Sequence, residues 1–256
     1  MIGLVLVTYA HWPQELITSI ERSKRDVVWY IHHHGSDPEL AEKIRGLGNR
    51  ANFRVYMHME NRGLARSWND GLREAYDDGA DLALLLNDDL FFISDGFDRF
   101  IDFGRSRRDY AVAYLNGLEG VNSAYANTIR AQDFACCIIT PLAIAQVGYF
   151  DQNFAPAYFE DNDYYKRCRV LGVDIIATPD VLVVHDRSKT TRDNPEIRQH
   201  HEDIFHANRD YFTRKWGSDN CDHDVFKHPF NDASLSPKIS WSGRDNPYPG
   251  HERKPV

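Results

Sequence analysis

The sequence is poor in cysteine and lacks the spacing that cysteine-based sites require. Its four cysteines include no CxxC pair: Cys136, Cys137, Cys168 and Cys221. The first two are adjacent and are not expected to bridge each other, which argues against a disulfide framework. We interpret the four residues as reduced, buried thiols in a cytoplasmic protein.

Long hydrophobic runs and an excess of basic charge are also missing. The apolar run 2–7 at the start is too short to cross a membrane and has no basic segment or cleavage signal beside it. The formal net charge is −8, which argues against a general binder of polyanions. We therefore expect no transmembrane segment, at most peripheral contact with a membrane, and no stable nucleic-acid partner.

The chain has short apolar segments that alternate with amphipathic ones. Its 256 residues and 42% hydrophobic content are enough for one large α/β domain. Apolar runs predict strands at residues 2–9, 27–32, 53–58, 82–86 and 111–115. Apolar stripes at helical spacing lie between the first four. This order predicts an α/β fold, a doubly wound, mostly parallel central sheet with helices on both faces, which binds ligands at the carboxyl ends of its strands.

The pattern is less regular after residue 116. Further strands are expected at 134–140 and 173–184, the second broken by Pro179, and helices at 160–171 and 196–216. Residues 217–256 are rich in Asp, Asn, Pro and His and are expected to form an extended C-terminal tail. We predict a single domain over residues 1–216.

Two acidic clusters are the main candidates for a functional site. The strand at 82–86 is followed by Asn87-Asp88-Asp89, and adjacent carboxylates there repel each other unless a hard divalent cation neutralises them. The alternative is an ordinary turn, since Asn and Asp are common at strand ends. The second cluster, residues 160–163, holds three carboxylates at a helix start, more than helix capping needs. His185 ends an apolar strand, and Asp186 beside it is placed to orient the imidazole.

These segments, in their order and spacing, resemble the family 2 glycosyltransferases of the GT-A fold. The resemblance covers residues 2–216. It includes the opening strand, the Asn-x-Gly-x-Ala helix start, the position of the Asp-x-Asp metal motif, the G-x-F-D and E-D-x-D segments, the strand that ends in histidine and the closing helix: residues 5–9, 60–71, 84–89, 147–151, 160–163, 183–185 and 208–216. Each motif alone is weak, but together they make a specific signal.

The resemblance implies a role for each candidate residue. Asp89 and His185 would hold Mn²⁺ or Mg²⁺, Asp161 would be the general base of an inverting single displacement, and Glu160 would assist it. Residues 1–110 would bind the nucleotide sugar and residues 111–216 the acceptor, a glycan, a lipid-linked sugar or another hydroxyl compound. The implied donor-binding residues are Thr8, Tyr9, His33, Asn61, Gly63, Arg66, Asn87 and Asp88. The implied acceptor-binding residues are Tyr158, Phe159 and Asp163.

The sequence departs from the family pattern in three places. Asn87 replaces the leading Asp, as in some rhamnosyltransferase-like members that use deoxysugar donors, so the position does not identify the donor sugar. The resemblance implies a UDP- or dTDP-sugar as donor. A His triplet, residues 32–34, stands where an Asp usually contacts the nucleotide. Neighbours on a strand point to opposite faces, so we expect one His, His33, to face the nucleotide. Trp68 stands where an Arg is common, and Arg66 is expected to reach the phosphate instead.

Two other classes of protein remain open. A sugar nucleotidyltransferase would share the sheet and the metal, but it would normally have a glycine-rich loop after the first strand, and residues 9–13 contain no glycine. A non-catalytic sugar-nucleotide-binding or scaffold protein would keep the fold without needing both acidic clusters. Metal-dependent hydrolysis of a donor would distinguish an enzyme from such a scaffold.

Overall fold

The structure of the chain is a computed structural model. It describes residues 1–107, 109–115, 134–178, 181, 183–185, 195–240 and 246–254. The strands are β1 Ile2–Thr8, β2 Val27–His33, β3 Phe53–Met57, β4 Leu82–Leu86, β5 Leu90–Phe92, β6 Val112–Leu115, β7 Cys136–Ile139, β8 Ile175–Thr178 and β9 Val183–His185. The helices are α1 Gln14–Glu21, α2 Pro38–Leu47, α3 Leu64–Asp77, α4 Gly96–Ser106, α5 Pro141–Gln146, α6 Glu160–Leu171 and α8 Pro195–Trp216, with a 3-10 turn η1 at Pro229–Asn231.

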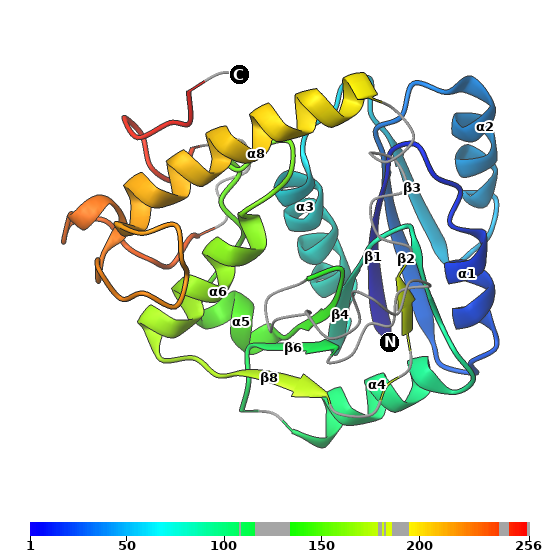
Figure 1. Cartoon of the computed structure of the whole chain (residues 1–256). Helices are drawn as coiled ribbons and strands as arrows, with labels where there is room; N and C mark the ends of the chain where they lie inside the picture. The colour runs from blue at the N-terminus through cyan, green and yellow to red at the C-terminus, as the bar shows by residue number, and fades with distance from the viewer. Residues whose placement is uncertain are drawn as a thin grey trace.

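Seven of these strands form a central sheet in the order β3-β2-β1-β4-β7-β6-β8 (Figure 1). The first four are parallel, β7 is antiparallel to both its neighbours, and β6 and β8 are parallel to each other. The chain leaves β1 toward β2 and β3 and then returns to the other side of β1 through α3 to form β4. The strand order therefore changes direction between β1 and β4, which is where open α/β sheets bind ligands.

Helices cover both faces of the sheet, as the alternation of segments predicts. Apolar side chains of α1, α2 and α4 pack with Leu4 and Leu6 of β1 on one face. Side chains of α3, α5 and α6 pack on the other face with Val5, which lies between those two leucines in the strand. This is the alternation expected of a strand whose successive side chains point to opposite faces. The predicted mixed α/β class is confirmed.

Three elements, α4, α5 and β5, are absent from the sequence-based expectation. The helix α4 carries an apolar stripe of Phe97, Phe100 and Ile101 at helical spacing, and this stripe would have predicted the helix. Helix α5 has six residues, too few for a periodic pattern, although Thr140 caps it by accepting from Ala143 N–H. Strand β5 has three residues and pairs with β9 in a separate two-stranded sheet.

The described part of the tail packs against α8 and α6 (Figure 1). Ile239 of the tail exchanges backbone hydrogen bonds with Val147 and Tyr149. Cys221 and Tyr248 are buried. The domain limits predicted at residues 110 and 216 remain predictions.

A buried ionic network joins α8 to α6. The Lys215 ammonium lies 2.8 Å from Asp151 and 2.7 Å from Asp163, and Asp163 also accepts from Arg167 at 2.8 Å. The four side chains are fully buried. Tyr211 donates a further hydrogen bond to Asp151. Buried charges persist only when they are paired in this way, so the network fixes how α8 lies against α6.

Within the described part of the chain, no helix is both long enough and apolar enough to cross a membrane. All four cysteines are described and buried, and none forms a disulfide with another. The prediction of buried thiols is confirmed.

Candidate active site

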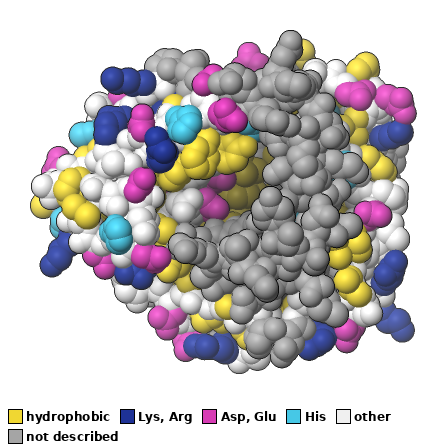
Figure 2. Space-filling model, viewed as in Figure 1, with side chains coloured by type: hydrophobic (Ala, Val, Ile, Leu, Met, Phe, Trp, Pro, Cys, Tyr) yellow, Lys and Arg dark blue, Asp and Glu magenta, His cyan; other side chains and the backbone are white. Residues whose placement is uncertain are grey.

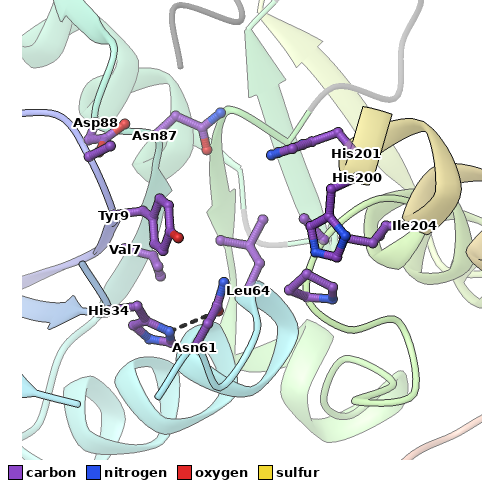
Figure 3. Close-up of a pocket in the computed structure, with 13 residues that line it drawn as sticks. Val7, Tyr9, His34, Asn61, Leu64, Asn87, Asp88, His200, His201 and Ile204 are labelled. Atoms are coloured by element: carbon purple, nitrogen blue, oxygen red, sulfur yellow. Dashed lines mark hydrogen bonds between the residues drawn. The ribbon is translucent and has the colours of Figure 1, made fainter. Parts of the chain in front are cut away.

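A cavity of about 530 Å³ opens at the carboxyl ends of the parallel strands. Figure 2 shows that this face of the molecule is hollowed, with hydrophobic and acidic side chains together in the hollow. Residues that follow β1 and β4 form one wall, and α8 forms the opposite wall (Figure 3). The lining residues are Val7, Tyr9, Ala10, His34, Asn61, Leu64, Asn87, Asp88, Pro156, Ala157, His200, His201 and Ile204. The cavity therefore lies where the strand order predicts a ligand site.

Two of the three polar residues that follow β4 line this cavity, and Asp89 is not among the lining residues. Asn87 and Asp88 line it, and burial together with the charge of Asp89 raises the pKa of Asp88 to about 8. Asp89 Oδ1 is 3.0 Å from His185 Nε2, and both side chains are largely buried. No described residue makes a hydrogen bond of acceptable geometry with Asp89 Oδ1 or with His185 Nδ1. The pairing of β5 with β9 explains the proximity, because it sets Leu90 opposite His185.

The His triplet divides between the core and the cavity. Strand β2 ends at His33, whose Nδ1 lies 2.9 Å from Thr8 Oγ1, and both residues are buried beside the cavity without lining it. His34 is the first residue beyond the strand, so the strand alternation no longer governs it, and its side chain lines the cavity. His33, the histidine expected at the nucleotide, is thus adjacent in sequence to the one that lines the cavity. Burial lowers the pKa of His34 to about 4, so its ring is neutral.

The start of α3 forms the end of the cavity next to His34. Asn61 lines the cavity and its Oδ1 accepts from Gly63 N–H at 3.0 Å. Gly63 has φ +82, a conformation that glycine adopts without strain, and an added Cβ would come within 3.4 Å of Ala155 and Pro156. Arg66 is partly buried in the first turn of α3 and is not among the lining residues.

The segment before α6 is strained and held in place by α8. Tyr158 and Phe159 both have positive φ, +80 and +71, which is uncommon for residues with large side chains. The amide Nδ2 of buried Asn208 donates to the carbonyls of Ala157 at 2.7 Å and Tyr158 at 3.0 Å. The Tyr158 hydroxyl lies 2.6 Å from His201 Nδ1. Strain of this kind persists only where surrounding contacts over-determine the backbone, and it clusters at functional sites.

The two carboxylates that open α6 differ in their surroundings. Glu160 is buried, and burial followed by the charge of Asp161 raises its pKa well above the usual value. Asp161 is partly exposed and accepts from Asn162 N–H at 2.7 Å. Neither residue lines the cavity, but both follow Pro156 and Ala157, which do. The catalytic roles expected for the pair remain predictions.

Two of the expected acceptor-binding residues are part of the core. Asp163 has no exposed surface, and its oxygens accept from Lys215, Arg167 and Trp216. A carboxylate with no exposed surface cannot contact an acceptor, so the acceptor role expected for Asp163 is wrong and its role is structural. Phe159 is 8% exposed and packs against Phe212.

The α8 wall holds lining residues that the sequence analysis missed. His200, His201 and Ile204 of this helix face Tyr9 and Asn87 across the cavity (Figure 3). A histidine on an amphipathic helix has no local signal that assigns it to a site, since the position depends on how the helix crosses the sheet.

No family model matches the chain. A stretch of 42 residues, 16% of the chain, is 52% identical to a galactofuranosyl glycosyltransferase of Leishmania donovani. That match spans 10% of the curated relative, so only a small part of that protein is represented here.

Solved structures match a much larger part of the chain. A mannosyltransferase, PcManGT from Pyrobaculum calidifontis, in complex with GDP-Man and Mn²⁺, has a TM-score of 0.57 at 14% identity, over 82% of this chain and 63% of that one. S. aureus TarS has a TM-score of 0.57 at 15% identity, over 84% of this chain and 73% of that one. TarS in complex with UDP-GlcNAc has a TM-score of 0.55 at 12% identity, over 75% and 61%. At these identities the likeness establishes a shared architecture. The chain has the GT-A fold of these glycosyltransferases, as its sequence predicts.

Proposed function

We propose that the chain is a glycosyltransferase that moves a sugar from a nucleotide-sugar donor to an acceptor hydroxyl, with a divalent metal and with inversion. The observation that carries the proposal is the contact between Asp89 and His185 directly after Asp88, which lines the cavity at the carboxyl ends of β1 and β4. The fold neighbours are glycosyltransferases, one of them in complex with GDP-Man and Mn²⁺ and another with UDP-GlcNAc. A UDP- or dTDP-sugar is the donor that the sequence favours.

The residues next to β4 fit a divalent cation. Two cis ligands of an octahedral ion with bonds of about 2.1 Å lie about 3.0 Å apart. Asp89 Oδ1 and His185 Nε2 are 3.0 Å apart, and Asp89 Oδ1 has no hydrogen-bond partner among the described residues. No group of three or more candidate ligands occurs within the described ranges. Two protein ligands are enough for Mg²⁺ or Mn²⁺ when substrate phosphates complete the shell, as is common for Mg²⁺.

The role of a bound Mn²⁺ or Mg²⁺ is to offset the negative charge of the departing nucleoside diphosphate. Asp88 and Asn87 lie beside this position and face the cavity, where they would contact the donor's ribose or sugar (Figure 3). Tyr9 is exposed at the cavity and offers an aromatic surface to the nucleotide. We place the diphosphate at this acidic end.

The general base is Asp161. In the transfer step the acceptor oxygen bonds to the anomeric carbon, the bond from that carbon to the diphosphate oxygen breaks, and Asp161 takes the hydroxyl proton. Glu160 is buried beside it, and burial followed by the charge of Asp161 raises the pKa of Glu160 well above its usual value. A carboxyl group that favours its neutral form beside the base is the arrangement expected when only one of the pair takes the proton.

The acceptor binds against the α8 wall. Ala157, His201 and Ile204 line this side of the cavity, and the Tyr158 hydroxyl lies against His201. Ala157 precedes the start of α6 by three residues, so an acceptor placed against it would stand near the first turn that holds the base.

Metal-dependent release of nucleoside diphosphate tests the proposal. The protein is incubated with UDP-, dTDP- and GDP-sugars, with MnCl₂ or with EDTA, and the released diphosphate is measured. We expect Mn²⁺-dependent hydrolysis of at least one donor, lost in Asp89→Ala and kept in Asp77→Ala, an exposed carboxylate at the end of α3. The first-formed anomer of the released sugar, read by NMR, reports inversion. The proposal is overturned if none of the donors releases its diphosphate in a metal-dependent way.

A further inference from the structure

The His201 side chain connects the α8 wall of the cavity to the segment before α6. It lines the cavity and extends from α8 in the direction of Asn87 on the opposite wall (Figure 3). Its Nδ1 lies 2.6 Å from the Tyr158 hydroxyl, and the two rings meet edge to face with their centroids 5.7 Å apart. Its Nε2 has no hydrogen-bond partner among the described residues. One ring nitrogen is therefore engaged by the protein, and the other is available to a ligand.

The Tyr158 hydroxyl determines which ring nitrogen of His201 carries the proton. Burial raises the pKa of Tyr158, so the hydroxyl keeps its proton. Burial, followed by the charge of His200, lowers the pKa of His201, which favours the neutral ring with one donor and one acceptor nitrogen. A phenol donates more readily than it accepts, because its oxygen lone pair is delocalised into the ring. Tyr158 thus donates to Nδ1, and His201 offers the cavity an N–H donor at Nε2.

Tyr158 is itself held by one face of α8. Its backbone has φ +80, and the Asn208 amide donates to its carbonyl at 3.0 Å and to that of Ala157 at 2.7 Å. Its ring packs on Phe205, with the centroids 5.7 Å apart. His201, Phe205 and Asn208 follow one another at steps of four and three residues, which places them on the same side of a helix. These contacts fix the His201 ring before a ligand binds, as expected of a residue in a binding site.

His201 lies along the path that a transferred sugar takes under the proposed function. The diphosphate and its metal belong at the end of the cavity beside Asp88, and the base Asp161 follows Tyr158 by three residues. The anomeric carbon lies between the departing diphosphate and the attacking oxygen, so the sugar spans the space between these two ends. His201 faces this space from the wall opposite Asn87. A neutral N–H donor suits a sugar hydroxyl, whereas the charge of the diphosphate is offset by the metal.

We infer that the Nε2–H of His201 donates a hydrogen bond to a hydroxyl oxygen of the sugar that is transferred, and that Tyr158 positions the ring for this contact. The inference rests on the proposed function and adds to it a contact between α8 and the donor sugar. His201 is a binding residue, and Tyr158 acts through it. Because the contact is made to the sugar, His201 distinguishes a nucleotide sugar from the bare nucleoside diphosphate.

Calorimetry measures this contact by comparing a nucleotide sugar with its own diphosphate. The donor that releases its diphosphate in the metal-dependent screen is used, at one fixed Mn²⁺ concentration, and the two affinities give a ratio. His201→Phe keeps a ring and removes the N–H. The ratio is expected to shift about tenfold against the nucleotide sugar, the order of one lost hydrogen bond, while the diphosphate binds normally. His201→Gln keeps an N–H donor near the position of Nε2 and is expected to keep the ratio within about threefold of the wild type.

Nitrogen NMR of the histidine rings tests the tautomer and the role of Tyr158. We expect the Nε2–H tautomer for His201 in the wild type, with its signals identified by their absence from His201→Gln. In Tyr158→Phe the shifts of the two ring nitrogens are expected to move toward their average, because the tautomers then interconvert. Unchanged shifts would refute the positioning role of Tyr158. A wild-type ring with its proton on Nδ1 would overturn the inference as a whole.

The outcomes separate this inference from the proposed function. The control His206→Phe makes the same change at an exposed histidine of α8 that does not line the cavity, and it is expected to keep the wild-type ratio. If His201→Phe is folded in thermal melts and keeps the wild-type ratio, or weakens the diphosphate as much as the nucleotide sugar, the inference fails and the proposed function stands. If no donor shows metal-dependent release, both fail.

Discussion

The two aspartates in the first turn of α6 are expected to respond oppositely to the same substitution. Asp161 is partly exposed, and its carboxylate accepts a hydrogen bond from the N–H of the next residue, Asn162. Asp163 is fully buried and is held by Lys215, Arg167 and Trp216. Burial alone would raise the pKa of Asp163, but the charges of Lys215 and Arg167 lower it below its usual value. Asp163 is therefore ionised and serves the fold.

The magnitudes follow from these surroundings. Asp163→Asn leaves Arg167 without a carboxylate in the described structure and Lys215 with only Asp151, and breaking a buried ion pair costs about 3–5 kcal/mol. In a protein of this size that lowers the melting temperature by roughly 6–20 °C. Asp161→Asn changes the free energy of unfolding by about 0.5 kcal/mol or less. It removes the proposed base, which costs about 10²- to 10⁴-fold in transfer rate.

Thermal melts, nucleotide calorimetry and donor turnover on the two variants form the assay. Asp161→Asn is expected to melt with the wild type, bind nucleoside diphosphate normally and turn over donor slowly. Asp163→Asn is expected to have a lower melting temperature than the wild type and, at temperatures where it is folded, to bind nucleotide. Near-normal turnover by Asp161→Asn would refute its assignment as base. An unchanged melting temperature for Asp163→Asn would refute the structural role of the buried network.

Three further predictions concern the metal edge and α8. Asp89→Ala is expected to lose most Mn²⁺-dependent donor turnover and His185→Ala less, since water can replace a neutral ligand; equal losses would contradict this. Because burial and the charge of Asp89 raise the pKa of Asp88 to about 8, the Asp88 carboxyl destabilises the metal-free fold increasingly as pH rises from about 4 to 8, so Asp88→Asn in EDTA should melt higher than wild type at pH 8 but not at pH 4. Asn208→Ala leaves the carbonyls of Ala157 and Tyr158 without this donor and should lower the free energy of unfolding by about 1–3 kcal/mol, which denaturant titration measures. Donor turnover should fall more than donor affinity, which kinetics and binding measurements compare.

Much of the fold was predictable because local patterns and tertiary structure agree. The apolar run of β4 and the helix α6 have the bounds that the sequence predicts. The ends of β1 and β2 differ from the prediction by one residue each. Elements of three or six residues, such as β5 and α5, are too short to show a period, and tertiary pairing decides whether they form.

The site was predictable where residues follow a strand and less so elsewhere. Asn87 and Asp88 line the cavity because β4 ends there, and strand ends can be read from sequence. Asp161 and Asp163 lie two positions apart on a helix and therefore point in directions about 200° apart, so the sequence already indicates that both cannot face the acceptor equally. The buried position of Lys215 could not be predicted, because lysine is rarely buried and only the fold shows its two carboxylate partners.

The effect of Mn²⁺ on nucleotide affinity is the most direct test of the proposed metal-dependent donor site. Calorimetry of UDP, dTDP and GDP binding is carried out with and without Mn²⁺ on the wild type, Asp89→Ala and the control Asp77→Ala. We predict that Mn²⁺ tightens binding of at least one nucleotide by about tenfold or more, in the wild type and in Asp77→Ala but not in Asp89→Ala. Equal affinities with and without metal for every nucleotide would contradict the account.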